Sequence, residues 1–293
     1  MTDAILIAGP TASGKSRLAI DIARSEGGTV INADSMQVYR ELRILSARPD
    51  EVDLSAVPHD LYGHVPAATR YSVGLWLNDA AHALDRARSE GRMPIFVGGT
   101  GLYFRALTEG LASIPPVPAE VRERLADETR DVASEVLHAR LTACDPHTAG
   151  EIPPSDRARI CRALEVFEAT GRPLAAWREG PGVPPPVSGD VRRMVIAPDR
   201  AWLHQRISER ADAMLHEGVL QEVRRLLGLG LSPELPAMKA IGVRHFHDHL
   251  EGNLSLGEAI AGVKTETRRY AKRQETWFRN QMPDWPRVGP PGP

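Results

Sequence analysis

Residues 9–16 spell Gly-Pro-Thr-Ala-Ser-Gly-Lys-Ser, a complete G-x-x-x-x-G-K-[ST] phosphate-binding loop. The apolar run 4–8 precedes this loop, and apolar residues at helical spacing follow it. A strand that enters such a loop turns successive backbone N–H groups toward one point, at the positive end of the next helix. Lys15 adds a cation, and Ser16 adds a hydroxyl that suits Mg²⁺. The sequence therefore predicts an α/β fold that binds a di- or triphosphate.

The loop alone does not identify the ligand. Most chains with this motif bind ATP or GTP, so a nucleotide-binding kinase or NTPase is the general expectation. NTPases usually keep an acidic residue at the end of a second apolar strand, where it holds Mg²⁺. Here the run Ile95-Phe96-Val97 ends in glycine, which counts against hydrolysis but not against a small-molecule kinase.

Strand and helix patterns alternate over the first hundred residues. The apolar runs 29–33 and 93–97 are typical of buried strands, and residues 73–90 carry apolar positions at helical spacing. This alternation predicts a P-loop parallel sheet flanked by helices, with ligands at the carboxyl ends of the strands. The phosphate loop, Asp34 and Thr100 all fall at such ends.

Prolines and glycines divide the chain. Pro115, Pro116 and Pro118 precede a purely helical stretch, and a Pro/Gly-rich segment at 180–189 follows it. We therefore predict that the α/β core has two parts, 1–114 and 190–285, and that the second part ends in a basic helix. Residues 115–189 between them would form a helical insertion domain. Residues 286–293 would form a disordered tail.

The composition predicts a cytoplasmic protein. The two cysteines have no C-x-x-C spacing and suggest no disulfide framework. No apolar stretch is long enough to cross a membrane, and the N-terminus has no signal-peptide pattern. A net charge of −2 excludes a wholly basic surface, but not a local basic face. A monomer is the default expectation.

An acidic residue and a glycine-rich turn follow two of the predicted strands. Asp34 could hold Mg²⁺ through water, accept a proton from a nucleophile, or cap a following helix. The phosphate loop beside it favours a functional role, because it supplies a leaving group. In the run 98–101, Gly-Gly-Thr-Gly, a tight turn and a ligand contact are equally good interpretations.

Two segments are locally basic, and a further pair of arginines shares a helical face. Arg159 and Arg162 share a helical face, as do Arg206 and Arg210, and each could either reach a phosphate or pair with a nearby acid. The last predicted helix carries six cations against two anions, with aromatic residues between them: Lys264, Arg268, Arg269, Lys272, Arg273 and Arg279. A solvated face and an RNA backbone contact are equally good interpretations of this helix.

Three histidines lie close together in the sequence but do not predict a metal site. His245, His247 and His249 are spaced by two, so they do not share one helical face, and no cysteine is near them.

The ordered set of motifs resembles the bacterial tRNA dimethylallyltransferases, also called tRNA isopentenyltransferases or IPP transferases. The resemblance runs from about residue 4 to about residue 280. It rests on the segments 9–16, 34–37, 98–103, 162–166, 171–173, 204–207, 239–242, 270–274 and 276–278. The phosphate loop is shared with many unrelated proteins, whereas the set in this order is specific to the family.

The resemblance implies transfer of a dimethylallyl group from dimethylallyl diphosphate to tRNA. The acceptor would be the exocyclic amine of the adenosine 3′ of the anticodon, and diphosphate would be released. The implied partners are dimethylallyl diphosphate and the anticodon stem-loop of tRNA, with Mg²⁺ as the cofactor. The target base would have to leave its stack and enter a channel between the sheet domain and the helical insertion.

The resemblance also assigns site residues. Asp34 would be the general base, and the other catalytic residues would be Lys15, Thr11 and Arg210. Diphosphate would be bound by Gly9, Thr11, Ala12, Ser13, Gly14, Lys15 and Ser16, with the metal at Ser16. Contacts to tRNA would come from Asp34, Ser35, Met36, Gln37, Thr100, Arg122, Arg159, Arg162, Lys239, Gly242 and Arg244.

Some positions depart from the family pattern. Ala158 stands where glutamine is usual, Val243 where tyrosine is usual, and 45–49 reads Leu-Ser-Ala-Arg-Pro instead of Gly-Thr-Ala-Lys-Pro. These differences weaken the predicted RNA contacts at those points. They do not affect the phosphate loop or Asp34.

Two other functions compete with prenyl transfer. A small-molecule kinase using ATP would explain the phosphate loop and the acid, but not the helical insertion or the basic helix. A non-catalytic RNA-binding module with a vestigial loop is disfavoured, because Lys15 and Ser16 are both intact.

Overall fold

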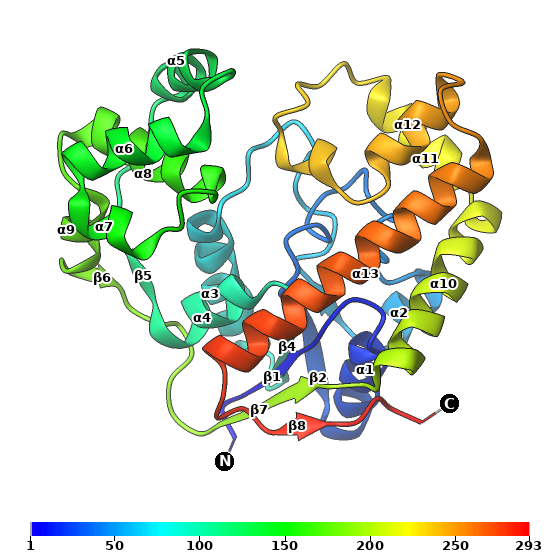
Figure 1. Cartoon of the computed structure of the whole chain (residues 1–293). Helices are drawn as coiled ribbons and strands as arrows, with labels where there is room; N and C mark the ends of the chain where they lie inside the picture. Colours follow the sequence, from blue (N-terminus) through cyan, green and yellow to red (C-terminus); the bar gives the residue numbers. More distant parts are fainter. Residues whose placement is uncertain (1, 293) are drawn as a thin grey trace. The chain divides into compact units, whose positions relative to one another are not determined.

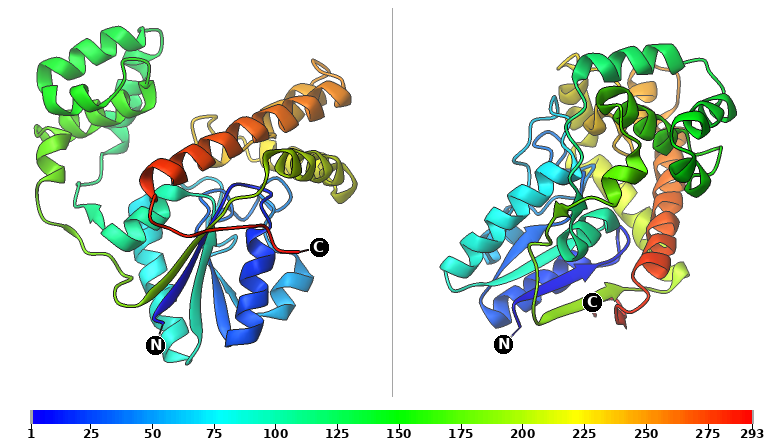
Figure 2. Two further views of the ribbon diagram at one scale, coloured as in Figure 1. Left: turned by 60° about the horizontal axis from the view of Figure 1, so that its bottom comes forward. Right: turned by 90° about the vertical axis from the view of Figure 1, so that its left-hand side faces the viewer.

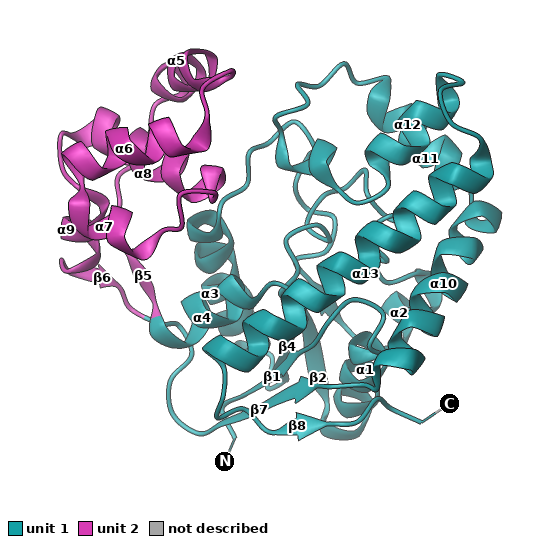
Figure 3. Ribbon diagram, in the orientation of Figure 1, with its two compact units in different colours: residues 1–109, 185–293 teal, residues 110–184 magenta. Residues whose placement is uncertain are grey.

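A parallel sheet of six strands runs through the larger of the two units into which the chain divides, residues 1–109 and 185–293 (Figure 3). The computed structural model describes residues 2–292 (Figure 1). Across the sheet the order is β3-β2-β4-β1-β7-β8, and all neighbours are parallel. The strands are β1 (Ala4–Ala8), β2 (Gly28–Asn32), β3 (His59–Asp60), β4 (Met93–Gly98), β7 (Val191–Ile196) and β8 (Arg287–Val288). The predicted parallel sheet flanked by helices is confirmed.

The strand that leads to the phosphate loop lies in the middle of the sheet. Ile7 of β1 is in register with Val97 of β4 on one side and with Met194 of β7 on the other. All five residues of β1 are buried, as is typical of a strand covered on both faces. Helices α1 and α2 lie on one face and α3 and α4 on the other (Figure 2). Their bounds are α1 (Lys15–Glu26), α2 (Glu51–Ala56), α3 (Val73–Ser89) and α4 (Gly101–Glu109).

The second half of this unit is mostly helical. It contains α10 (Arg200–Glu217), α11 (Val219–Leu227), the 3-10 turn η1 (Pro236–Lys239), α12 (Val243–Leu250) and α13 (Leu256–Gln281). Helix α13 begins with a capping box, in which the Ser255 and Glu258 side chains each accept from the other's backbone N–H. Farther along, its residue Gln274 reaches Thr11 after β1 and Gly99 after β4. Helix α13 therefore lies over the carboxyl ends of these strands (Figure 2).

The smaller unit, Gly110–Pro184, is helical around its own core (Figure 3). Buried leucines and isoleucines of α5, α6 and α8 form this core, among them Leu125, Leu141 and Ile160. A short antiparallel pair, β5 (Leu111–Ala112) with β6 (Gly182–Val183), joins its two ends. With this ladder the unit begins at residue 110 and ends at residue 184, whereas the sequence predicted 115–189. The helices are α5 (Ala119–Thr129), α6 (Ser134–Cys144), α7 (Pro146–Glu151), α8 (Arg157–Thr170) and α9 (Leu174–Arg178).

The sequence predicted a disordered tail over residues 286–293, but part of this segment is ordered. Residues Arg287 and Val288 form β8 and pair with Val195 and Ile196 of β7. The Arg287 guanidinium donates to the backbone oxygens of Phe278 and Met282 at the end of α13, each at 3.0 Å. Backbone pairing and these side-chain bonds order a segment whose composition suggested a free tail. Within residues 2–292, no helix is both long and apolar enough to cross a membrane.

Candidate active site

The phosphate loop joins β1 to α1, and the strand before it and the helix after it are as the sequence predicted. Gly14 has a φ of 86°, in the left-handed region that favours glycine, and Ala12 has a φ of 64°. The Lys15 side chain is buried, and its ammonium donates to the Pro10 carbonyl at 3.2 Å. Burial lowers the pKa of Lys15 from 10.5 to about 8; the charge of Asp34 opposes this shift, and that of Arg210 adds to it. Lys15, Asp34 and Arg210 are therefore close enough to interact.

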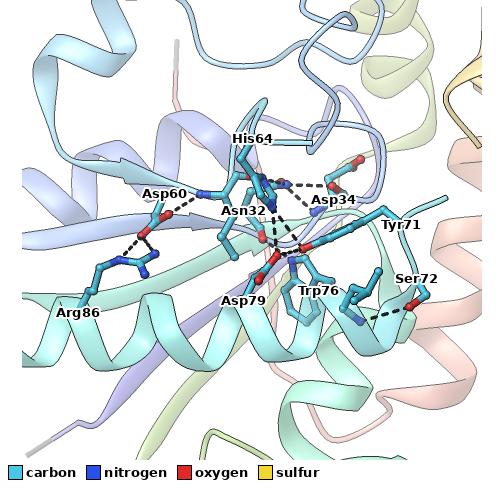
Figure 4. Close-up of polar contacts among 11 residues, drawn as sticks. Asn32, Asp34, Asp60, His64, Tyr71, Ser72, Trp76, Asp79 and Arg86 are labelled. Carbon is cyan, nitrogen blue, oxygen red and sulfur yellow. Dashed lines mark hydrogen bonds and ion pairs between the residues drawn. The ribbon is translucent and has the colours of Figure 1, made fainter. Parts of the chain in front are cut away.

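Asp34 is held at the end of β2 by Asn32. The Asn32 side chain accepts from the Asp34 N–H and donates to the Asp34 carbonyl, both at 2.9 Å (Figure 4). One carboxylate oxygen, Oδ1, accepts from the backbone N–H of Met36 at 2.9 Å. No hydrogen bond of the other oxygen, Oδ2, is found among residues 2–292. Asp34 thus caps a turn, rather than a helix, with one oxygen, and its other oxygen has no hydrogen bond among the described residues.

Aromatic packing supports this position from below. The Trp76 indole N–H donates to the Asn32 carbonyl at 3.0 Å, and the Trp76 ring stacks on Tyr103 at 4.1 Å between centroids. Beside it, Tyr71 donates to Asp79, which also lies 3.4 Å from His64 (Figure 4). Helix α3 therefore fixes the strand end that carries Asp34.

The glycines of the turn 98–101 allow other parts of the protein to pack closely against its backbone. A Cβ at Gly98 would lie 2.0 Å from the Ala33 carbonyl oxygen, and one at Gly101 would lie 2.1 Å from the Trp277 ring. Between them, Thr100 accepts from the backbone N–H of Ser35 at 2.9 Å through its hydroxyl. The turn therefore locks β4 to the segment that begins at Asp34.

Of the two arginines that share a face of α10, only Arg210 belongs to this site. Its guanidinium is buried and donates to the Thr11 hydroxyl at 2.8 Å and to the Leu45 carbonyl at 2.9 Å. Its Nε is buried with no partner among the described residues. Burial lowers the pKa of Arg210, and the charge of Asp34 opposes that shift. Arg206 is instead exposed and pairs with Glu209 at 2.9 Å.

These residues meet at a pocket of about 280 Å³. Its polar lining residues are Thr11, Asp34, Ser35, Ser46, Arg210, Lys239, Glu266, Thr267 and Arg273, and the rest of its lining is apolar apart from Tyr270. The apolar residues include Met36, Leu45, Ile207, Ala211, Met214, Ile241 and Val263, with Tyr270 beside them. Such a pocket suits a ligand with an anionic head and a short apolar tail.

A larger groove of about 1170 Å³ adjoins this pocket and shares Lys239, Ala240, Glu266 and Arg273 with it. Its lining is largely apolar, comes mainly from α12, α13 and the segment 231–242 that precedes α12, and carries more cations than acids. The cationic lining residues are Lys239, Arg244, Arg269 and Arg273. His245 also lines it and lies 3.0 Å from Glu266. Among residues 2–292, no group of three His, Cys, Asp or Glu side chains could hold a metal ion.

The predicted tRNA contacts fall in several places. Ser35 and Met36 line the pocket, and Lys239, Gly242 and Arg244 line the groove. Arg122, Arg159 and Arg162 lie in the smaller unit, where Arg122 and Arg162 pair with Glu165 and Arg159 with Asp156. The buried Gln37 amide donates to the Ser46 and Ala47 carbonyls, both at 2.9 Å. Its amide nitrogen is therefore engaged within the protein.

The sequence analysis missed two buried polar residues that build the site. The Glu222 carboxylate accepts from the backbone N–H groups of residues 43–45 at 2.8 to 2.9 Å and so fixes one wall of the pocket. Gln274 contacts both Thr11 and Gly99. Each occupies a position of its helix that periodicity assigns to the buried face, three residues after Val219 or Ala271. A polar residue on the face of a helix that is otherwise apolar was therefore the signal in the sequence that could have identified both residues.

Comparison with known proteins shows close relatives. The IPP transferase family model matches residues 37–281, and the isopentenyl transferase family model matches residues 2–59. The chain is 50% identical over 292 residues to the tRNA dimethylallyltransferase of Rhizobium meliloti (strain 1021), covering 99% of this chain and 96% of that one. It is 55% identical over 291 residues to the tRNA dimethylallyltransferase of Methylobacterium radiotolerans, covering 99% and 94%.

Solved structures show the same similarity. The tRNA isopentenylpyrophosphate transferase of Bacillus halodurans matches with a TM-score of 0.67 and 32% identity, over 97% of this chain and 89% of that one. A eukaryotic dimethylallyltransferase acting on tRNA matches with a TM-score of 0.81 and 28% identity, over 99% of this chain and 74% of that one.

Proposed function

The chain belongs to the IPP transferase family, and from this membership we infer that it transfers a dimethylallyl group to tRNA. This agrees with the resemblance seen in its motifs and argues against the small-molecule kinase that the phosphate loop alone would allow. We further propose that the donor is dimethylallyl diphosphate and that the acceptor is the exocyclic amine of the adenosine 3′ of the anticodon.

The pocket of about 280 Å³ carries this proposal, because it combines the three chemistries that the reaction needs. The Arg210 guanidinium and the Thr11 hydroxyl suit a diphosphate. The apolar walls suit a short branched hydrocarbon and keep water from the reacting carbon. The Asp34 carboxylate suits an amine that must lose a proton.

Hydrogen bonding within the pocket orients the donor-binding groups. Because Arg210 donates to the Thr11 hydroxyl oxygen, the hydroxyl hydrogen points elsewhere and is available to the diphosphate. Arg210 lines the pocket, and protonated Lys15, which interacts electrostatically with it, adds a second positive charge on this side. Fixed donors of this kind stabilise the negative charge that grows on the leaving diphosphate.

Mg²⁺ fits this site as an ion held largely by the substrate. Ser16 lies at the start of α1, and no hydrogen bond of its hydroxyl is found among residues 2–292. One protein hydroxyl together with diphosphate oxygens and waters is a ligand set that Mg²⁺ accepts. When bound there, Mg²⁺ would neutralise charge on the diphosphate.

The proposed transfer is a displacement at the first carbon of the dimethylallyl group. A C–N bond forms to the adenine amine while the C–O bond to diphosphate breaks, and the electron pair of that bond leaves with diphosphate. The amine also loses one proton, which Asp34 accepts at the oxygen free of hydrogen bonds. An adenine amine is a weak nucleophile because its lone pair is delocalised, so removing its proton lowers the barrier.

The groove beside the pocket, which four cationic side chains line, is the proposed path of the RNA. Its cations Lys239, Arg244 and Arg269 suit backbone phosphates, while the target base is turned out of its stack into the pocket. We propose further phosphate contacts from Arg122, Arg159 and Arg162 of the smaller unit. We propose that the protein acts as a monomer in the cytoplasm.

Incorporation of labelled donor into RNA tests the function. The protein is incubated with Mg²⁺, radiolabelled dimethylallyl diphosphate and an anticodon stem-loop RNA, with and without ATP. We expect label in the RNA without ATP, and none when inosine, which lacks the amine, replaces the target adenosine. ATP-dependent phosphorylation of a small metabolite, with no label in RNA, would restore the kinase hypothesis.

A further inference from the structure

Gln274 differs from its neighbours on α13 in being buried. Lys272 and Arg273 are exposed, whereas only 5% of Gln274 is accessible to solvent. A buried amide must find hydrogen-bond partners, because leaving one unpaired is costly. Its partners therefore indicate what the residue does.

Both ends of the Gln274 side chain bind the main chain at the carboxyl ends of strands. Oε1 accepts from the Thr11 N–H at 2.9 Å, and Nε2 donates to the Gly99 carbonyl at 2.8 Å. The orientation of the amide is unambiguous, since a flipped amide would oppose donor to donor and acceptor to acceptor. One side chain thus joins the phosphate loop to the turn after β4.

These two backbone points adjoin the groups proposed to react. Thr11 is the residue whose hydroxyl accepts from Arg210. At Gly99, a Cβ would lie 2.2 Å from the Gln274 nitrogen and 3.2 Å from Oδ2 of Asp34. Gln274 therefore spans from the diphosphate side of the pocket to the carboxylate side.

We propose that Gln274 is a positioning residue that fixes the phosphate loop relative to Asp34. This rests on the proposed function, because it assigns these two groups to donor binding and proton removal. With its N–H engaged by Gln274, Thr11 presents its hydroxyl to the donor, and the anion-binding N–H groups are those that follow it. Without Gln274, the Thr11 N–H would turn to another acceptor. The phosphate loop would then no longer be held in a fixed position relative to the Asp34 carboxylate.

Replacement by methionine tests the proposal, because Q274M preserves length and bulk but removes both hydrogen bonds. Gln281, exposed on the same helix, provides the matched control Q281M. Inorganic diphosphate with Mg²⁺ is the probe, titrated by calorimetry, so the measurement does not require turnover. We expect Q274M to weaken diphosphate binding about tenfold, with Q281M unchanged.

Three further measurements separate positioning from a merely structural role. Affinity for the stem-loop RNA should stay within about twofold of wild type, and KM for the prenyl donor should rise while KM for RNA does not. A folding defect would instead lower the melting temperature and the active fraction, leaving the constants of the remaining active protein unchanged. Equal diphosphate affinity in Q274M and wild type would overturn the proposal. A wild-type protein that bound diphosphate but transferred no label would overturn the proposed function instead.

A double-mutant cycle with Gly99 adds an independent test. The methyl group of G99A would collide with the Gln274 nitrogen, whereas Q274A removes that nitrogen. We therefore expect each single variant to weaken diphosphate binding and the double variant to bind no worse than Q274A. If the losses of diphosphate binding free energy in the two single variants add up in the double variant, the two residues act independently.

Discussion

Burial of Lys15 disfavours its protonated form, which is the form that would bind a diphosphate. The pKa of its ammonium falls from 10.5 to about 8, mainly through loss of solvation, although the nearby Asp34 carboxylate favours the charged form. The residue is therefore close to losing its charge under mildly alkaline conditions. A bound diphosphate would restore the charged form, so binding and protonation at Lys15 are linked.

Diphosphate affinity should consequently fall as the pH rises through about 8. Stability should change in the opposite direction: between about pH 8 and about pH 10.5 the unfolded chain binds more protons at Lys15, so this group favours folding increasingly as the pH rises. Calorimetric titration with Mg²⁺ and diphosphate, from about pH 7 to about pH 9.5, measures the first effect. K15R keeps its charge and should give a flatter profile; identical profiles for both proteins would contradict the assignment.

Removing the basicity of Asp34 should slow transfer strongly without weakening RNA binding. D34N keeps the acceptor for the Met36 N–H, so the turn should survive. We expect kcat to fall about 10² to 10⁴-fold, with RNA affinity unchanged, because general-base catalysis contributes about this much. D50N is the matched control, since Asp50 caps the exposed start of α2 in a similar way. Near-normal turnover in D34N would exclude Asp34 as the base.

At the scale of elements, one wall of the pocket depends on hydrogen bonds from distant helices. Glu222 of α11 holds the N–H groups of residues 43–45, and Arg210 of α10 holds the Leu45 carbonyl. Gln37 binds the carbonyls of Ser46 and Ala47. The segment has no regular secondary structure, so these side chains supply the partners that a helix or strand would provide.

Loss of the Glu222 carboxylate should therefore destabilise the protein and the donor site together. E222A leaves three backbone N–H groups without their acceptor, and we expect a loss of about 3 kcal/mol in the free energy of unfolding. Diphosphate affinity should fall as well, since Leu45 holds Arg210. Chemical denaturation compares E222A with E217A, an exposed glutamate at the end of α10. Equal midpoints for the two variants would contradict this role.

The local parts of the site could be predicted from the sequence, and the long-range parts could not. The phosphate loop and Asp34 follow apolar strands directly, so their placement needs no knowledge of the rest of the chain. Gln274 bonds to a residue 263 positions away, and no pattern in its own helix names that partner. Arg206 and Arg210 are equivalent in the sequence, and only packing shows which one is buried. Strands β3 and β8 have two residues each, too few to form a periodic pattern.

For the whole molecule, the C-terminal segment ties the sheet edge to the long helix. The single side chain of Arg287 binds carbonyls at the end of α13 while its backbone pairs with β7. R287A should lower the free energy of unfolding by about 1 kcal/mol, which is about 2 °C in melting temperature for a chain of this size. R279A, an exposed cation on α13, is the control in thermal melts. A melting temperature equal to that of R279A would contradict this link.

The order of the strands also bears on how the protein is made. A ribosome releases the phosphate loop among its first residues, yet β7, Arg210 and Gln274 emerge only after the smaller unit has been completed. Until then β1 has one neighbour instead of two, and the Thr11 amide lacks its acceptor. Because folding during translation proceeds from the N-terminus, the nascent enzyme stays inactive until nearly the entire chain has been synthesised.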